Sequence, residues 1–224
     1  MRILVLSFLI FSQLSSYSQF NYFEKGKKAL YWGISLGINS SNFSIDRQPI
    51  STLNDTILNV NARSSPGFNL GLIGNWQFNK YFDLRFIPNM TFGEKIIEYQ
   101  TMNSYVENKI NTTYITVPIL IRFKAEPIND LRIFLIGGLK YDYNIIPQQR
   151  TKAEPERIPL KKNGLSMEYG IGVQYFFPYF IFSPEIKYSH SLFNMLDGNQ
   201  SDLNNSAIKG LYPRTLTISI NFEG

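Results

Sequence analysis

Cysteine is absent from the sequence, and histidine occurs once, as His190. Without a thiol the chain forms no disulfide, offers no cysteine ligand to a metal ion and has no site for a lipoprotein anchor. With one histidine, every mechanism that needs an imidazole as a base or nucleophile has to use His190. These absences exclude cysteine-based enzymes and leave few routes to a hydrolase or a metal centre.

Long apolar runs are nearly absent as well. The longest, Ile3–Phe11, is interrupted by one serine and is shorter than the roughly 20 apolar residues that a transmembrane helix needs. A positive residue precedes it and small residues follow, with Ser16 and Ser18 at the −3 and −1 positions of a cleavage site. This pattern favours an export signal over a buried N-terminal helix. We therefore divide the chain into a cleaved signal peptide (1–18), a short periplasmic segment (19–29) and the folded domain (30–224).

Charge is scarce and aromatic side chains are abundant. Charged residues make up 17% of the chain and aromatic residues 15%, with 18 Phe and 14 Tyr. The net charge of +5 falls to about +4 when the signal peptide and its one arginine are removed, and no basic stripe dominates, so nucleic acid is not an expected partner. Few charges and many aromatics are typical of a membrane β-barrel, in which aromatic girdles flank an apolar outer band.

Apolar and polar residues alternate in eight stretches after the signal, as they do in β-strands with one apolar face. The stretches are 30–39, 68–78, 82–92, 115–123, 132–143, 165–175, 180–189 and 215–222. The last is the clearest, because leucine, isoleucine and phenylalanine alternate there with threonine, serine and asparagine. An even number of such strands predicts an all-β fold, an eight-stranded antiparallel closed transmembrane β-barrel of the outer-membrane type and of OmpA or OmpX size.

The connections between these stretches alternate in length. The long, polar connections are 44–64, 101–109, 144–163 and 193–209, and the short ones are 79–80, 124–130 and 177–179. This order predicts long extracellular loops, short periplasmic turns and both chain termini in the periplasm of an integral outer-membrane protein. Ile96–Tyr99 are expected to extend the strand at 82–92 beyond the membrane and to pair with the start of the next strand.

Three prolines, Pro88, Pro118 and Pro184, lie inside predicted strands. Proline has no N–H and cannot donate to a strand ladder. A closed barrel has no edge strand that would accommodate it, so we expect a β-bulge at each of the three positions.

Full charges occur on the polar faces of the predicted strands and are nearly absent from the apolar faces. The charged positions are Asp83, Arg85, Arg122, Arg132, Lys140, Asp142, Glu168, Glu185 and Lys187. An arginine or lysine that faces lipid at mid-depth costs about 2–4 kcal/mol, so these side chains are expected to face the lumen. A soluble ligand-binding barrel would instead turn its apolar face inward. In so narrow a barrel the charges are expected to pair into a network that fills the lumen and leaves no open pore.

Small and aromatic residues also have expected places in this barrel. Six glycines on the polar faces are expected to make room for long inward side chains: Gly33, Gly37, Gly71, Gly138, Gly170 and Gly172. Aromatic residues near strand ends are expected to form the interfacial girdles: Tyr31, Tyr81, Tyr141, Tyr143, Tyr175, Tyr179, Phe180 and Tyr188. The terminal Ile220–Asn221–Phe222 resembles the signal read by barrel-insertion machinery, which is an expected partner together with outer-membrane lipid.

Two constellations are candidates for chemistry. Ser189 and Ser191 flank His190, but neighbouring residues of a strand point to opposite faces, so a structural histidine is favoured over a Ser–His pair. Glu168 and Glu185 suggest a carboxylate dyad, but the basic residues on the same faces favour a salt-bridge network. We predict no catalytic, cofactor-binding or metal-binding residue, and therefore no enzyme.

Two charged segments are candidates for contacts with a partner. Gln148–Lys162 is a long loop that contains two prolines, and Glu24–Lys28 lies in the expected periplasmic segment. A solvated loop and a frayed chain end are the alternatives at these positions.

Several motifs together resemble the PorT family of outer-membrane barrels. They are Trp32–Gly37 (WGISLG) with Asn39 and Phe43, Pro66–Phe68, Ile115–Phe123 (ITVPILIRF), Gly137–Tyr141 (GGLKY), Ser183–Ser189 (SPEIKYS) and Phe222–Gly224. The resemblance spans essentially the whole mature chain. The motif at 115–123 is shared by many related barrels, whereas those at 183–189 and at the C-terminus are more specific to PorT.

This resemblance implies a function that the residues alone do not show. PorT-like proteins are outer-membrane components required by the type IX secretion system, which exports surface and secreted proteins and supports gliding in some bacteria. The implied partners are other type IX secretion proteins, and the implied role is assembly or transport. The alternative is an adhesion or surface-binding barrel that acts through its long loops, while the single histidine disfavours an outer-membrane hydrolase.

Overall fold

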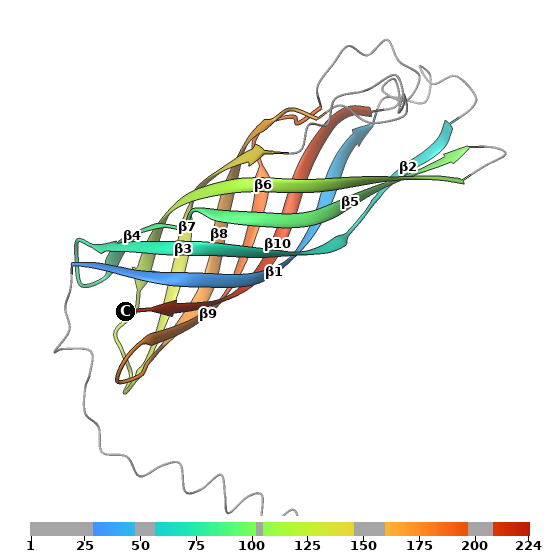
Figure 1. The fold of residues 1–224 in the computed structure, drawn as a ribbon. Coiled ribbons are helices and arrows are strands. Elements are labelled where there is room, and N and C mark those ends of the chain that lie inside the picture. The colour runs from blue at the N-terminus through green and yellow to red at the C-terminus, as the bar shows by residue number, and fades with distance from the viewer. Residues whose placement is uncertain (1–28, 48–56, 102–104, 146–159, 197–207) are drawn as a thin grey trace, which may run out of the picture.

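Figure 1 shows the fold in a computed structural model of the chain, which describes residues 29–47, 57–101, 105–145, 160–196 and 208–224. The expected signal peptide (1–18), the segment Glu24–Lys28 and all but the last residue of the expected periplasmic segment (19–29) lie outside the described residues. So does most of the loop Gln148–Lys162. The expectations for these segments stay predictions.

The described residues form β-strands joined by turns. In chain order these are β1 (Leu30–Arg47), β2 (Ile57–Arg63), β3 (Ser65–Gln77), β4 (Phe82–Phe86), β5 (Asn89–Thr101), β6 (Tyr105–Lys124), β7 (Leu131–Asn144), β8 (Asn163–Phe176), β9 (Ile181–Ser191) and β10 (Ile208–Glu223). All pairings between them are antiparallel. Within these ranges no helix is long and apolar enough to cross a membrane.

The strands close into a ring. β1 pairs with β10 on one side and with β3 on the other, and the order β1-β10-β9-β8-β7-β6 continues through β4 and β5 to β3. β4 and β5 lie in line, because both pair with β3 and β6, while β2 pairs only with the far part of β5 (Figure 1). Eight strands therefore surround the lumen, which confirms the predicted fold class.

The two ends of the barrel differ in their connections. The short connections 78–81, 125–130 and 177–180 lie at one end, here called the turn end, where Gly224 N–H also donates to the carbonyl of Trp32 at 2.9 Å. The strand ends that flank the longer connections lie at the opposite end, the loop end (Figure 1). Two predicted loops contain more strand than expected, because β1 continues to Arg47 and the 101–109 connection is mostly β5 and β6. Ile96 pairs with Lys109, which confirms the expected extension.

The bulges expected at Pro88, Pro118 and Pro184 are wrong. The strand register runs unchanged through all three positions. The carbonyl of Pro88 accepts from Leu72 N–H at 3.0 Å, and that of Pro118 accepts from Ile87 N–H at 3.3 Å. Each of these two prolines lacks the N–H that would donate to the facing residue, but its carbonyl still accepts from the N–H of that residue. The pairing therefore needs no extra residue at either position.

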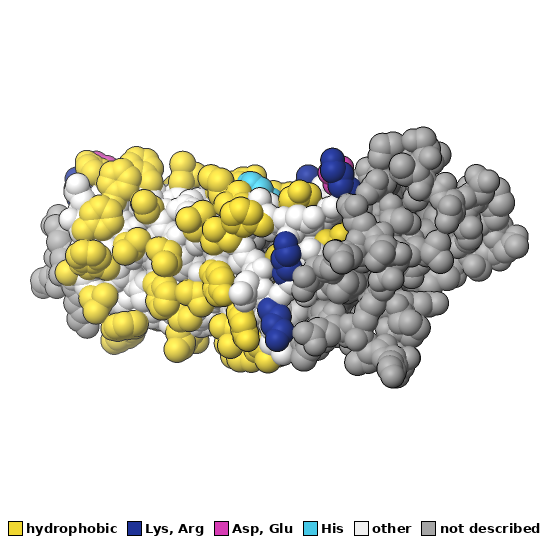
Figure 2. Space-filling model, turned by 90° about the horizontal axis from the view of Figure 1, so that it is seen from above, with side chains coloured by type: hydrophobic (Ala, Val, Ile, Leu, Met, Phe, Trp, Pro, Cys, Tyr) yellow, Lys and Arg dark blue, Asp and Glu magenta, His cyan; other side chains and the backbone are white. Residues whose placement is uncertain are grey.

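Alternation along the strands places apolar side chains on the outer face and charged side chains in the lumen, as predicted. Outward Trp32 and Leu72 are 62% and 64% exposed, whereas inward Arg85 and Arg122 are fully buried. In Figure 2 apolar side chains are spread over the described part of the barrel on the face in view. A surface this apolar, wrapped around a charged interior, suits lipid rather than water.

The girdle prediction is wrong for Tyr31. The other predicted girdle aromatics have exposed or half-exposed rings, but the Tyr31 hydroxyl donates to Asp83 Oδ2 at 2.9 Å inside the lumen. Tyr31 shares the inward positions of Gly33 and Ser35 on β1, so strand alternation overrides its preference for an interface.

The inward glycines make room in two ways. A side chain at Gly172 would meet the Phe134 ring, and one at Gly37 would meet the Asn69 amide, as the prediction of crowded long side chains requires. At Gly138 and Gly170, however, an added Cβ would meet the backbone of the neighbouring strand. There the glycines permit close strand approach and do not make room for a long side chain.

Candidate functional site

Charged side chains fill the lumen towards the turn end. Together they form what we call the turn-side network: Asp83, Arg85, Arg122, Lys124, Glu185, Lys187 and Glu223. Each is at most 5% exposed. β4, β6, β9 and β10 supply them at the inward positions that alternate with the apolar band.

Arg122 links opposite walls of the barrel. Its Nη2 lies 2.5 Å from Asp83 Oδ2, and its Nη1 lies 3.3 Å from Glu223 Oε2. Its guanidinium also donates to the hydroxyl of Tyr31. Lys124 Nζ lies 2.5 Å from Asp83 Oδ1, so this carboxylate is held by two cations.

Arg85 continues the network towards the loop end. It donates to Glu185 Oε2 at 2.7 Å and pairs with Glu223, whose other oxygen accepts from Asn75 Nδ2 at 3.1 Å. Lys187 Nζ lies 2.8 Å from Glu185 Oε1. Buried charges are tolerated when each has partners, and this arrangement confirms the predicted salt-bridge network.

Sequence reasoning missed two members of this network. Glu223 is not among the charges that the alternation predicts for the lumen, and Lys124 falls in the predicted short connection 124–130. Both carry a detectable signal, because Glu223 continues the inward positions of Ser219 and Asn221, and Lys124 those of Arg122. The last strand thus contributes a carboxylate that two arginines share across the lumen.

An apolar layer lies among the charges, and the alternation did not predict it. Its members are Ile73, Ile87, Leu120, Phe134 and Ile136, all at most 4% exposed. The Phe134 ring centre lies 5.2 Å from the Arg122 guanidinium carbon and 5.9 Å from that of Arg85, within the range of cation–π contact. Around several of these positions both faces of the strand are apolar, so the period of two is lost in the sequence.

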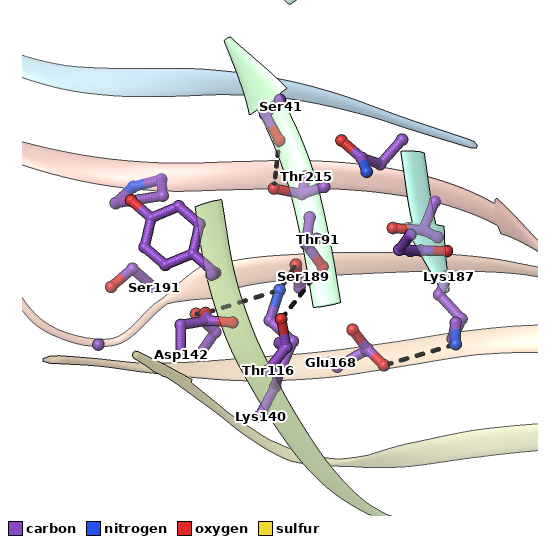
Figure 3. Close-up of a pocket in the computed structure, with 18 of the residues that line it drawn as sticks. Ser41, Thr91, Thr116, Lys140, Asp142, Glu168, Lys187, Ser189, Ser191 and Thr215 are labelled. Carbon is purple, nitrogen blue, oxygen red and sulfur yellow. Dashed lines mark hydrogen bonds and ion pairs between the residues drawn. The ribbon is translucent and has the colours of Figure 1, made fainter. Parts of the chain in front are cut away.

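Above the network, towards the loop end, the lumen contains a cavity of about 60 Å³ (Figure 3). Serine, threonine and asparagine line most of it, and Thr91 and Thr116 share a hydrogen bond of 3.1 Å there. Both polar atoms of the Asn39 amide are buried in its wall and have no hydrogen-bond partner among the described residues. A cavity with such walls has room and polar groups for a few water molecules.

Two ion pairs border this cavity. Lys140 Nζ donates to Ser189 Oγ at 2.9 Å and lies 3.7 Å from Asp142 Oδ2. Lys187 Nζ lies 3.9 Å from Glu168 Oε1, as Figure 3 shows. Because Lys187 stands between Glu168 and Glu185, these carboxylates belong to the salt-bridge network and not to a catalytic dyad of facing acids.

The Ser–His arrangement is not assembled. Ser189 and Ser191 face the lumen, where Ser191 donates to the carbonyl of Phe193 at 2.8 Å. His190 lies on the outer face, with its ring centre 6.1 Å from that of Tyr169. The described residues also contain no group of three or more acidic, histidine or cysteine side chains placed to hold a metal ion.

At the turn end an exposed ion pair joins two neighbouring turns. Lys80 Nζ lies 2.6 Å from Glu126 Oε1, which also accepts from the Tyr81 hydroxyl at 3.0 Å. The hydrogen bond from Lys80 holds the pKa of the Glu126 carboxyl below its usual value, and the same bond raises the pKa of Lys80. Full exposure to solvent screens this pair, so the connection supports the turns only weakly.

Proteoliposomes that contain the purified barrel are expected not to swell in isotonic solutions of small sugars, and planar bilayers are expected to show no conductance steps. The reason is that the turn-side network and the apolar layer fill the lumen cross-section with buried side chains. Vesicles without protein and vesicles with an open porin give the two reference rates. Regular conductance steps from the pure barrel would contradict a filled lumen.

Comparison with known proteins gives concordant results. A family model described as "Outer membrane protein beta-barrel domain" matches residues 11–197. The crystal structure of the outer membrane protein OprG from Pseudomonas aeruginosa is similar with a TM-score of 0.56 and 12% identity, over 89% of this chain and 98% of that one. Neisserial surface protein A (NspA) gives a TM-score of 0.46 and 11% identity, over 88% of this chain and 97% of that one. No curated protein sequence matches significantly.

Proposed function

The chain belongs to the outer membrane protein β-barrel domain family. From the resemblance of its sequence motifs to PorT-like proteins, we propose that it serves protein export by the type IX secretion system as a non-enzymatic component or assembly factor. The barrel sits in the bilayer of the outer membrane. Within the proposal, the turn end and both termini face the periplasm, the loop end faces outward, and residues 1–18 are removed after export.

The filled lumen carries the non-enzymatic, non-channel part of this proposal. Buried ion pairs and the apolar layer occupy the inside of the barrel, so a substrate protein has no path through it. A barrel of this kind acts through its surfaces, by holding or assembling other components. The resemblance of Ser183–Ser189 and of the C-terminal strand to PorT supports type IX secretion as the setting.

Deleting the gene is expected to remove a whole class of proteins from the culture medium and the cell surface. Their precursors should accumulate in the periplasm, because export stops at the outer membrane, and mass spectrometry of the three fractions measures this. Complementation with the wild-type gene should restore secretion. Gliding, where the bacterium shows it, should be lost and restored in parallel.

Normal secretion in the deletion strain would refute the proposal. Loss of attachment to surfaces without any change in secretion would then favour the alternative, an adhesion barrel that acts through its long loops. Barrel abundance in the outer membrane of the complemented strain, measured by heat-modifiable electrophoretic mobility, shows that the folded protein is present in the comparison.

A further inference from the structure

On the outer face of β8 to β10, towards the loop end, four side chains that the lumen does not use lie among apolar ones, and Met167 and Leu192 extend the apolar surface past the two tyrosines. The four residues, which we call the lipid-edge cluster, are Tyr169, Tyr188, His190 and Arg214. They occupy outward positions of three neighbouring strands, directly towards the loop end from Ile171, Ile186 and Leu216, which are 50%, 50% and 44% exposed. The only histidine of the chain is therefore an outer-surface residue, with Met167 as its cross-strand partner on β8.

The cluster is compact. The Tyr169 and Tyr188 ring centres are 5.7 Å apart, and the His190 ring lies 6.1 Å from the first and 6.5 Å from the second. Arg214 is the cross-strand partner of His190 on β10. Directly paired residues of antiparallel strands project from the same face with their Cβ atoms about 5 Å apart, so the arginine stands beside the imidazole.

The Arg214 guanidinium has no carboxylate partner among the residues that the structure describes. Further exposed cations, Lys161, Lys162 and Lys209, lie farther towards the loop end. Lys161 Nζ donates to the Asn194 carbonyl at 3.1 Å, and the Asn194 amide donates to the Lys209 carbonyl. Asp46 on β1 is an exposed acid at this end. Figure 2 shows basic side chains along the border between the apolar band and the loop end.

We propose that the lipid-edge cluster binds the phosphate of an anionic lipid headgroup in the membrane leaflet at the loop end. The guanidinium of Arg214 matches phosphate oxygens with two parallel donors. The tyrosine hydroxyls and the imidazole add polar atoms at the height where aromatic rings of membrane proteins meet headgroups. The apolar band next to the cluster offers a surface for the acyl chains of a lipid. A soluble anion has no acyl chains and would not use that surface.

The proposal rests on the outer-membrane location of the barrel and not on its role in secretion. It is tested on purified protein, where no secretion component is present, so its failure and that of the secretion role are distinguishable. A barrel that selects anionic lipid but is dispensable for secretion would keep this proposal and refute the other.

The test is native mass spectrometry of the mature barrel in detergent, titrated with dioleoylphosphatidylglycerol or dioleoylphosphatidylcholine. Wild type is expected to bind the anionic lipid roughly tenfold more tightly, the size of one charge-assisted contact. Arg214→Gln should abolish most of this selectivity, and His190→Gln should reduce it. Lys80→Gln, which removes an exposed cation at the opposite end, should leave it unchanged.

Folding of each variant is checked by its heat-modifiable electrophoretic mobility, and if Arg214→Gln does not fold, the wild-type selectivity and His190→Gln decide. Equal binding of the two lipids by wild type would overturn the proposal. Equal effects of Arg214→Gln and Lys80→Gln would do the same. Full displacement of the lipid by inorganic phosphate at the lipid's own concentration would assign the cluster to a free anion and reject a lipid site.

Discussion

The Arg122→Met variant is expected to lose about 3–5 kcal/mol of the free energy of unfolding of the barrel. Arg122 is wholly buried and touches the carboxylates of Asp83 and Glu223 and the hydroxyl of Tyr31. Methionine keeps an unbranched apolar stem but lacks the guanidinium, so each of these carboxylates has one cation fewer in a site that water does not reach. Lys124 still pairs with Asp83 and Arg85 with Glu223, but removing one partner from a buried ion-pair network costs more than breaking an exposed pair.

The measurement is urea unfolding of the refolded barrel in lipid vesicles, followed by tryptophan fluorescence. Both tryptophans, Trp32 and Trp76, face outward and report contact with lipid. Because Glu223→Gln removes a carboxylate that has lost one of its two arginine partners, the double variant Arg122→Met/Glu223→Gln should regain part of the loss. Lys80→Ala, at the exposed pair, serves as the control and should not change the midpoint. A loss below about 1 kcal/mol in Arg122→Met would mean that the network does not stabilise the fold.

Ile119→Arg is expected to destabilise the inserted barrel by about 2–4 kcal/mol, whereas Ile128→Arg is expected to change its stability by no more than about 0.5 kcal/mol. Both isoleucines are exposed, at 53% and 73%, but they differ in surroundings. Ile119 lies in the middle of the outward face of β6, between lipid-facing Phe86 and Leu139, and Ile128 lies in a turn. A guanidinium at mid-depth must lose its water, and one at the turn end keeps it.

The same vesicle unfolding experiment measures both variants, with insertion scored by electrophoretic mobility. Repeating it in detergent micelles tests the cause, because a micelle is thinner and wetter than a bilayer and should reduce the difference between the variants. Equal stability of the two variants in bilayers would show that the outer surface near Ile119 does not face lipid. That result would contradict the membrane orientation of the barrel wall.

The fold was predictable because its main signal is local. Strand alternation of period two depends only on which face of each strand meets lipid, and it held for the outward residues of all eight strands. The alternation failed at Ile73, Ile87, Leu120, Phe134 and Ile136, where inward positions are apolar too. The interior contains both ion pairs and an apolar layer, so polar and apolar side chains both fit there. Lipid excludes charged side chains, and the sequence pattern is therefore more regular on the outward face.

The prolines and Tyr31 were predicted wrongly for a related reason. The expected bulges followed from the proline rule for a single strand, but Pro88 and Pro118 each keep a carbonyl bond to a neighbouring strand, which only the pairing reveals. Tyr31 was assigned to a girdle by residue type, although its inward position places its hydroxyl on Asp83. At such positions the alternation of the strand decides to which face a side chain points. Moving one residue to the other face would move every other side chain of the strand as well.

The sequence by itself determined that this chain forms eight strands with one lipid-facing side and that its charges belong inside, because lipid enforces these properties residue by residue. Only the tertiary structure decided which charges meet. Asp83 and Arg122 are brought together by the register of β4 and β6, but the pairs of Arg85 with Glu185 and Glu223 join strands that are not neighbours. Such contacts across the lumen depend on closure of the ring, which brings residues 100 or more positions apart within hydrogen-bonding distance, and no local pattern encodes that closure.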